Sequence, residues 1–183
     1  MIYFDHNATS FIRDEVKKSL MEYYSGSSGF GNPSSSTNPG KISYDIIRKS
    51  RLQVSDCLKV DPEEIVFTGS GSEANNAAIK GIAFKHIADK GHIISSKIEH
   101  PSVLNALEYL EDLDFTVTYL DVERDGRVAA QSVKNNLRSN TILVSIMAVN
   151  NEIGAINPIS EIGEVCQTAG VPFMVDGIQG LGK

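Results

Sequence analysis

The sequence lacks several features that would place it in a special class of protein. No stretch approaches the ~18 uncharged apolar residues that a membrane-spanning helix needs. Basic residues are not in excess, because 17 lysines and arginines stand against 23 acidic residues, and the net charge of −6 disfavours a nucleic-acid partner. Apolar residues make up 41% of the 183 positions, which excludes disorder over most of the chain. We therefore expect a globular protein with neither a membrane nor a nucleic acid as partner.

Cysteine is also scarce, since Cys57 and Cys166 are the only two. Neither belongs to a Cys-x-x-Cys motif or a Cys/His cluster, so we expect no metal site. Both lie in patterns typical of helices, where a buried thiol is the ordinary interpretation. Residues 1–5 lack the basic and apolar regions of a secretory signal, so we expect a reducing, cytoplasmic location.

One stretch differs in composition from the rest of the chain. Residues 25–40 are rich in Gly, Ser, Asn and Pro, which predicts a long loop. Apolar residues at helical spacing precede this loop at residues 13–24 and follow it at residues 42–58, so we predict a helix on each side.

From residue 64 onward, β-rich runs alternate with helical patterns. The predicted strands are residues 64–68, 92–96, 115–120, 141–149 and 171–175. The predicted helices are residues 72–90 with Gly91 as C-cap, 101–113, 129–137, and 160–169 with Ser160 as N-cap. This alternation predicts an α/β fold, with a mostly parallel sheet flanked by helices. Since ligands bind at the carboxyl ends of strands in such sheets, the residues after each strand are the candidates for a site.

The loop after the first predicted strand, residues 69–74, reads Gly-Ser-Gly-Ser-Glu-Ala. Its glycines let the backbone approach a ligand, and the helix that follows offers free amides to a phosphate, to which Ser72 can add a hydroxyl. The alternative is a tight turn with Ser72 as the helix N-cap. The loop also matches a loose form of the dinucleotide-binding fingerprint, although Glu73 would repel a pyrophosphate there.

Polar groups also follow later predicted strands. His100 can cap the next helix, stack on a flat cofactor or carry a proton. Asn150 and Asn151 can form a turn or direct an amide at a ligand oxygen. Asp176 needs a partner, which can be a cation, a metal, a protonated ring nitrogen or the amides of its own loop. A phosphate cradle, an imidazole, an amide and an acid are together the set that pyridoxal phosphate requires.

At this point the sequence resembles the N-terminal part of the cysteine desulfurases, within the class V aminotransferase-like, fold type I pyridoxal-phosphate enzymes. Any one of the shared motifs is weak, but their common order along the chain is specific. They are YFDHNAT at 3–9, GNPSS at 31–35, IVFT and the Gly/Ser-Glu-x-Asn loop at 65–75, Glu99-His100, VNNEIG at 149–154, and VD-x-x-QG-x-GK at 175–183.

The resemblance implies a set of cofactor-binding residues. Gly71 and Ser72 would hold the phosphate of pyridoxal phosphate. Asn151 and Gln179 would bond to the side of the ring that carries the hydroxyl, and Asp176 would pair with the ring nitrogen. The implied architecture is an incomplete large domain of the fold type I class.

The resemblance also implies an activity and partners. His100 would be the catalytic residue of this chain, stacking on the ring and moving protons. Members of the family convert cysteine to alanine and keep the sulfur as a persulfide on an enzyme cysteine. They pass that sulfur to acceptors, including iron–sulfur cluster scaffolds, and are usually homodimers.

The resemblance implies a domain division and an incomplete chain. Residues 1–40 would be an N-terminal helix and loop segment, and residues 41–183 part of the pyridoxal-phosphate-binding domain. Lys183 does not correspond to the lysine that attaches to the cofactor, and neither cysteine takes the nucleophile's place. We therefore expect a truncated product or fragment, inactive alone, that forms a homodimer or pairs with the missing C-terminal part.

Three alternatives stay open. The first is another class V enzyme, such as a selenocysteine lyase or an aminotransferase. Another is a non-catalytic protein that pairs with a full-length desulfurase. The last is a dinucleotide-binding domain, based on the Gly69-x-Gly71-x-x-Ala74 match.

Overall fold

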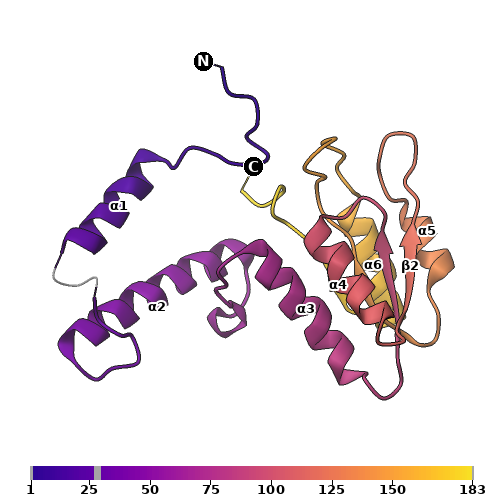
Figure 1. Cartoon of the computed structure of the whole chain (residues 1–183), viewed down its shortest axis with the longest axis horizontal. Coiled ribbons are helices and arrows are strands. Elements are labelled where there is room, and N and C mark those ends of the chain that lie inside the picture. The colour runs from indigo at the N-terminus through magenta and orange to yellow at the C-terminus, as the bar shows by residue number, and fades with distance from the viewer. Residues whose placement is uncertain (1, 27–29, 183) are drawn as a thin grey trace. The chain divides into compact units, whose positions relative to one another are not determined.

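A computed structural model describes residues 2–26 and 30–182 of the chain (Figure 1). The chain divides into two compact units, Met1–Phe67 and Thr68–Lys183. This division lies at a different place from the boundary between residues 40 and 41 that we assigned from the resemblance. That boundary concerns the large domain of the family and stays a prediction.

The first unit is helical. Helix α1 spans Asp14–Ser25, helix α2 spans Asn38–Leu58, and a short 3-10 helix, η1, spans Pro62–Glu64. Both predicted helices are confirmed, but α2 begins earlier than predicted, because the Thr37 hydroxyl caps it by accepting a hydrogen bond from the Gly40 amide at 3.3 Å. The predicted loop is shorter as a result, and its residues 27–29 lie outside the described residues.

Residues 64–68 were predicted to be a strand, and that prediction is wrong. The run pairs with no strand among the described residues, and the sheet is built from other segments. Instead, the guanidinium group of Arg51 donates to the carbonyl oxygen of Ile65 and lies 5.1 Å from the ring centroid of Phe67. A β-rich sequence makes a strand only where a neighbour completes its ladder, and here none does.

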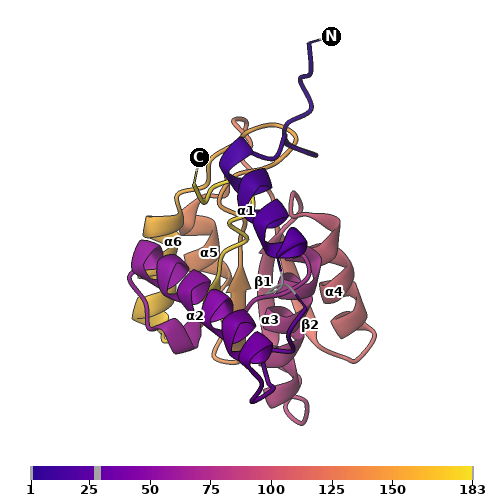
Figure 2. The ribbon, with the colours of Figure 1, turned by 90° about the vertical axis from the view of Figure 1, so that its left-hand side faces the viewer.

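The second unit holds a four-stranded parallel sheet with strand order β2-β1-β3-β4. Its strands are β1 (His92–Ser96), β2 (Thr116–Leu120), β3 (Thr141–Ser145) and β4 (Phe173–Met174). Its helices are α3 (Gly71–Lys85), α4 (Pro101–Glu111), α5 (Ala130–Asn136) and α6 (Ile159–Ala169). Figure 2 shows α3 and α4 on one side of the sheet and α5 and α6 on the other. The predicted α/β fold is confirmed.

Two apolar clusters fill the two faces of the sheet. Consecutive residues of a strand point to opposite faces, so Ile93 joins one cluster and Ile94 the other. The first cluster packs α3 and α4 against the sheet through Ile79, Val103, Leu107, Leu110 and Leu143. The second packs α5 and α6 through Val133, Val144, Ile146, Ile162 and Cys166. These contacts hold the strand ends rigidly at one edge.

Several predicted boundaries need correction. Helix α3 ends at Lys85, so Gly91 does not cap it; a Cβ at Gly91 would lie 2.5 Å from Ile142, which explains a glycine there by close packing. Ser160 lies inside α6, because the helix begins at Ile159 after Pro158. Strands β3 and β4 are shorter than predicted, since the segments beyond them turn away to form the loops of the site.

The two cysteines differ in exposure. Cys166 is buried as predicted, but Cys57 is exposed, because it faces solvent from α2. Within the described residues, no helix combines the length and the apolar character needed to cross a membrane.

Candidate functional site

The candidate site lies in the second unit, where the carboxyl ends of the strands meet the N-termini of α3 and α4. His100 follows β1 and precedes α4, Asn151 follows β3, and Asp176 follows β4. Gly71 and Ser72 are the first two residues of α3. The parallel topology therefore brings segments that are far apart in sequence to one edge of the sheet.

The N-terminus of α3 lies at this edge of the sheet, and its first residues determine which backbone amides are free. The predicted cap at Ser72 is wrong, since Ser70 caps the helix and its hydroxyl accepts from the Glu73 amide at 3.1 Å. The Glu73 carboxylate accepts from the Gly69 amide at 2.6 Å, which satisfies its charge locally. Among the described residues, the amides of Gly71 and Ser72 have no acceptor. Two free amides at a helix N-terminus attract a phosphate group.

Gly71 also lets the Asp176 loop approach this helix closely. A Cβ on Gly71 would lie 2.8 Å from the Cδ1 atom of Ile178, closer than van der Waals contact allows. The absence of a side chain at Gly71 therefore permits the close contact between the N-terminal end of α3 and the loop that carries Asp176.

Asp176 is a buried carboxylate, with only 7% of its surface exposed. Its Oδ2 accepts from the Asn75 side-chain amide at 2.9 Å, and its Oδ1 accepts from the Ile178 backbone amide at 3.1 Å. The predicted partner from its own loop is therefore present. Each carboxylate oxygen accepts more than one hydrogen bond, so Asp176 retains the capacity to bind a further donor.

His100 is the N-cap of α4, which is the first of the roles that the sequence left open. Its Nδ1 accepts from the Ser102 backbone amide at 3.1 Å, and the residue is exposed. Capping occupies one edge of the imidazole and leaves the face of the ring available for stacking.

The two asparagines after β3 have different environments. Asn150 is buried and forms the predicted turn, because its Oδ1 accepts from the amides of Glu152 and Ile153 at 2.9 and 3.0 Å. Asn151 is half-buried, and its side-chain amide makes no hydrogen bond within the described residues. Gln179 is also half-buried, in the turn that follows Asp176. The ligand roles of Asn151 and Gln179 stay predictions.

Glu99, the residue before His100, was not among the predicted site residues, although its side chain is buried and senses the charge of Asp176. It is 4% exposed, and its Oε1 accepts from the Ser96 hydroxyl at 2.5 Å and from the Met147 amide at 3.1 Å. Its Oε2 is buried without a partner among the described residues. Burial, helped by the negative charge of Asp176, raises the pKa of Glu99 to about 7, although the hydrogen bonds from Ser96 and Met147 act in the opposite direction. The argument used for Asp176, a carboxylate just after a buried strand, applies equally to Glu99.

The site fits a flat ligand with a phosphate at one end and a basic ring nitrogen at the other. The free amides of α3 suit the phosphate, and the buried carboxylate of Asp176 suits a protonated nitrogen. Pyridoxal phosphate has both groups. Lys183, the last residue of the shared motif, lies outside the described residues.

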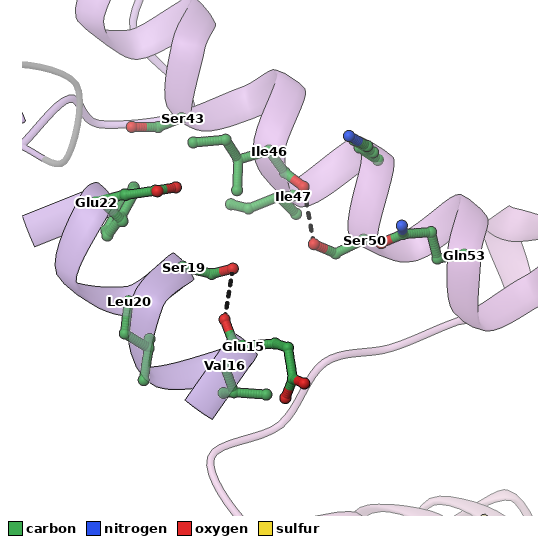
Figure 3. Close-up of a pocket in the computed structure, with 12 residues that line it drawn as sticks. Glu15, Val16, Ser19, Leu20, Glu22, Ser43, Ile46, Ile47, Ser50 and Gln53 are labelled. Atoms are coloured by element: carbon green, nitrogen blue, oxygen red, sulfur yellow. Dashed lines mark hydrogen bonds between the residues drawn. The ribbon is translucent and has the colours of Figure 1, made fainter. Parts of the chain in front are cut away.

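A groove with a volume of about 850 Å³ lies between α1 and α2 in the first unit (Figure 3). Two of its serine hydroxyls bond within their own helices: Ser19 donates to the Glu15 carbonyl at 3.0 Å and Ser50 to the Ile46 carbonyl at 2.9 Å. Much of the remaining lining is apolar, including Val16 and Leu20. Charged and polar side chains, among them Glu15, Glu22, Lys49 and Gln53, also line this groove.

Known proteins are similar to this chain along its whole length. The aminotransferase class-V family model matches residues 2–183. A cysteine desulfurase IscS of Buchnera aphidicola subsp. Schizaphis graminum is 44% identical over 183 residues, and that of Methanosarcina thermophila is 44% identical over 182. These alignments cover 100% and 99% of this chain but 45% and 44% of the relatives. The chain thus spans less than half the length of the curated relatives it matches.

Solved structures show the same fold. A structure described as SspA in complex with cysteine superposes with a TM-score of 0.91 at 41% identity, over 94% of this chain and 49% of the other. DndA from Streptomyces lividans superposes with a TM-score of 0.87 at 33% identity, over 100% of this chain and 51% of the other.

Proposed function

This chain belongs to the aminotransferase class-V family, and from that premise we propose that it forms the pyridoxal-phosphate site of a cysteine desulfurase. The whole protein would take the sulfur from cysteine and leave alanine. The observation that carries the proposal is Asp176, a buried carboxylate at the sheet edge beside a helix N-terminus with two free amides. A carboxylate is costly to bury, and a protonated ring nitrogen would repay that cost.

Each end of the cofactor has a partner in this proposal. The amides of Gly71 and Ser72 bind the phosphate, to which the exposed Ser72 hydroxyl adds a donor. Asp176 keeps the ring nitrogen protonated, and Asn151 and Gln179 orient the side of the ring that bears the hydroxyl. Pyridoxal phosphate, when bound, supplies an electron sink for bonds at the substrate carbon.

His100 has two roles in the proposal. The face of its imidazole packs against the ligand ring, and its Nε2 atom exchanges a proton with the substrate. Its Nδ1 stays fixed by the cap of α4 and takes no part in that exchange.

The sulfur of cysteine would pass to a thiolate and then to an acceptor protein, such as an iron–sulfur scaffold. Cys166 is a poor candidate for that thiolate, because it is buried and burial raises the pKa of its thiol. We propose that the whole protein forms a homodimer and takes its nucleophilic cysteine from outside these 183 residues.

Pyridoxamine 5′-phosphate is the probe that tests the cofactor site, because it carries the phosphate and the ring nitrogen but cannot condense with surface lysines. We expect saturable binding to the 183-residue chain, followed by the fluorescence of the probe. The Asp176→Asn variant should bind about 10- to 100-fold more weakly, the factor that corresponds to ~1.5–3 kcal/mol for a hydrogen bond to a charged group.

The exposed carboxylate of Asp121 provides the matched control, since Asp121→Asn removes the same charge from the loop after β2. That variant should bind like the wild type. Saturable binding of NAD in place of pyridoxamine phosphate would contradict the proposal and favour a dinucleotide site.

A further inference from the structure

Two polar side chains that no cofactor contact explains lie between Asp176 and His100. Asn75, on the second turn of α3, is 6% exposed, and Ser102 is in the first turn of α4. The Nδ2 atom of Asn75 lies 2.9 Å from the Oδ2 atom of Asp176 and 3.0 Å from the Oγ atom of Ser102. The Oγ atom of Ser102 lies in turn 2.8 Å from the Nδ1 atom of His100.

The chemistry of Asp176 and His100 fixes the direction of every hydrogen bond between them. An ionised carboxylate only accepts, so the atom that Asn75 turns to Asp176 is its NH₂ group, which has two hydrogens. The second hydrogen goes to the Ser102 hydroxyl, which therefore accepts from Asn75 and keeps its own hydrogen to donate.

His100 completes the chain as an acceptor. Its Nδ1 already accepts from the Ser102 backbone amide, so this nitrogen carries a lone pair rather than a proton. The Ser102 hydroxyl must then donate to Nδ1, and the proton of the neutral imidazole resides on Nε2.

We propose that Asn75 and Ser102 are positioning residues, which form a relay of hydrogen bonds from Asp176 to His100 that fixes the ring orientation of the imidazole and, together with the backbone cap, keeps its proton on Nε2. The purpose of this arrangement rests on the proposed function, in which Nε2 is the atom that faces the substrate. The relay joins the ends of β4, α3 and α4, whose residues are up to 101 positions apart.

The relay has a physical consequence for each member. Without the Ser102 hydroxyl, one hydrogen of the buried Asn75 amide loses its acceptor and His100 keeps only its backbone cap. Without the charge on Asp176, the Asn75 side-chain amide is no longer held with its NH₂ group toward Asp176. The direction of the hydrogen bonds from Asn75 to His100 is then no longer fixed.

The test reads the imidazole directly, in the chain without any cofactor. Long-range ¹H–¹⁵N correlation spectra report which nitrogen of each histidine is protonated, and a His100→Gln variant assigns His100 among the four histidines. The spectra are recorded at a pH where the imidazole is neutral. The wild type should show His100 protonated on Nε2, with Nδ1 as a hydrogen-bond acceptor.

Ser102→Ala should shift the Nδ1 resonance toward that of a nitrogen that accepts only the backbone hydrogen bond of the cap, while the proton stays on Nε2. Ser102→Thr keeps the hydroxyl and should restore the wild-type spectrum. Asn76→Ala is the matched control, because within the described residues the Asn76 side chain donates hydrogen bonds to backbone oxygens alone, those of Ser72 and Ser102. It should leave the His100 nitrogens unchanged.

The coupling to Asp176 requires a double-mutant comparison. Asp176→Asn should shift the His100 nitrogens in the same direction as Ser102→Ala, and the double variant should add nothing further. Unchanged His100 resonances in a folded Ser102→Ala chain would overturn the relay, as would fully additive shifts in the double variant.

The relay and the proposed function fail in different ways. If the wild type does not bind pyridoxamine phosphate, the proposed function is contradicted, and the spectra of the free chain still decide the relay. If both hold, Ser102→Ala should weaken binding of the probe about 2- to 10-fold, which is what the loss of one neutral hydrogen bond of ~0.5–1.5 kcal/mol gives.

Discussion

A buried carboxyl that keeps its proton makes the stability of this protein depend on pH. The pKa of Glu99 is about 7 in the folded chain, against an ordinary value of 4.5. Between these values the folded state holds a proton that the unfolded state has released, so this group lowers the free energy of unfolding as pH rises from 4.5 to 7. The full loss amounts to about 3 kcal/mol.

The Glu99→Gln variant should remove this loss, because glutamine keeps the oxygen that accepts from Ser96 and Met147 and cannot ionise. Relative to wild type, its free energy of unfolding should increase by up to about 3 kcal/mol between pH 4.5 and pH 7. Urea unfolding at several pH values measures this difference. Glu164→Gln, at an exposed position, is the control and should show no such change. A pH-independent difference for Glu99→Gln would mean that Glu99 is ionised when folded.

A buried histidine at the opposite end of β1 has the opposite effect to Glu99 on the pH dependence of stability. The ring of His92 lies between the hydroxyls of Thr141 and Thr118, each 2.9 Å away, and burial together with the charge of Arg138 lowers its pKa to about 4. The stabilisation is complete above pH 6.5 and is lost as pH falls toward 4. In that range the His92 imidazole binds a proton in the unfolded chain but stays neutral in the folded chain.

His92→Gln should therefore weaken the acid sensitivity of the protein. The variant is expected to lose packing energy at neutral pH, yet its free energy of unfolding should fall less than that of wild type between pH 6.5 and pH 4. The same urea series measures this slope. His6 is exposed and serves as the comparison, since His6→Gln should leave the slope unchanged. Parallel pH profiles for wild type and His92→Gln would contradict the assignment of a neutral buried ring.

At the scale of the element, the cap of α3 separates two serines that look equivalent in the sequence. The hydroxyl of Ser70 accepts from the Glu73 amide, whereas that of Ser72 is exposed one residue into the helix. Ser70→Ala should cost about 1 kcal/mol of unfolding free energy, the usual value of an N-cap. Ser72→Ala should cost much less but weaken pyridoxamine phosphate binding. Equal losses of stability in the two variants would show that the cap is shared.

Elements with a strong local signal were predictable from the sequence. The strand at His92–Ser96 and the helices on each side of it follow from patterns within a few residues. The run at 64–68 has the same β-rich character but no partner strand, and a ladder is a property of two segments. Local pattern alone therefore predicts where a strand is possible, and only the topology decides whether it forms.

The same distinction applies to the candidate site. The rule that ligands bind at strand ends made His100 and Asp176 candidates, because each lies in the segment that follows a predicted strand. Asn75 and Ser102 fall within helical patterns, where a polar residue ordinarily indicates a solvated face. Their roles depend on partners in other elements, such as the contact between Asn75 and Asp176, so no local pattern could reveal them.

For the whole molecule, the distribution of apolar burial differs between the two units. Every buried hydrophobic side chain among the described residues lies in the second unit. In the first unit, α1 and α2 bury only small residues such as Gly40 and Ser43, while Leu20 and Ile46 are exposed around the groove (Figure 3). An exposed apolar groove of this kind binds other apolar surfaces.

The 183-residue chain should therefore bind the dye 8-anilinonaphthalene-1-sulfonate at neutral pH while its second unit is folded. A Leu20→Glu, Ile46→Glu double variant places two charges in the groove and should remove most of the dye fluorescence, because the dye and the new carboxylates are both anionic. Ile153→Glu, an exposed residue of the second unit, is the matched control and should leave the fluorescence unchanged. Equal fluorescence from the wild type and the groove variant would mean that the exposed apolar surface lies elsewhere. Loss of fluorescence in both variants would indicate a general effect of added charge, so only a loss confined to the groove variant supports the assignment.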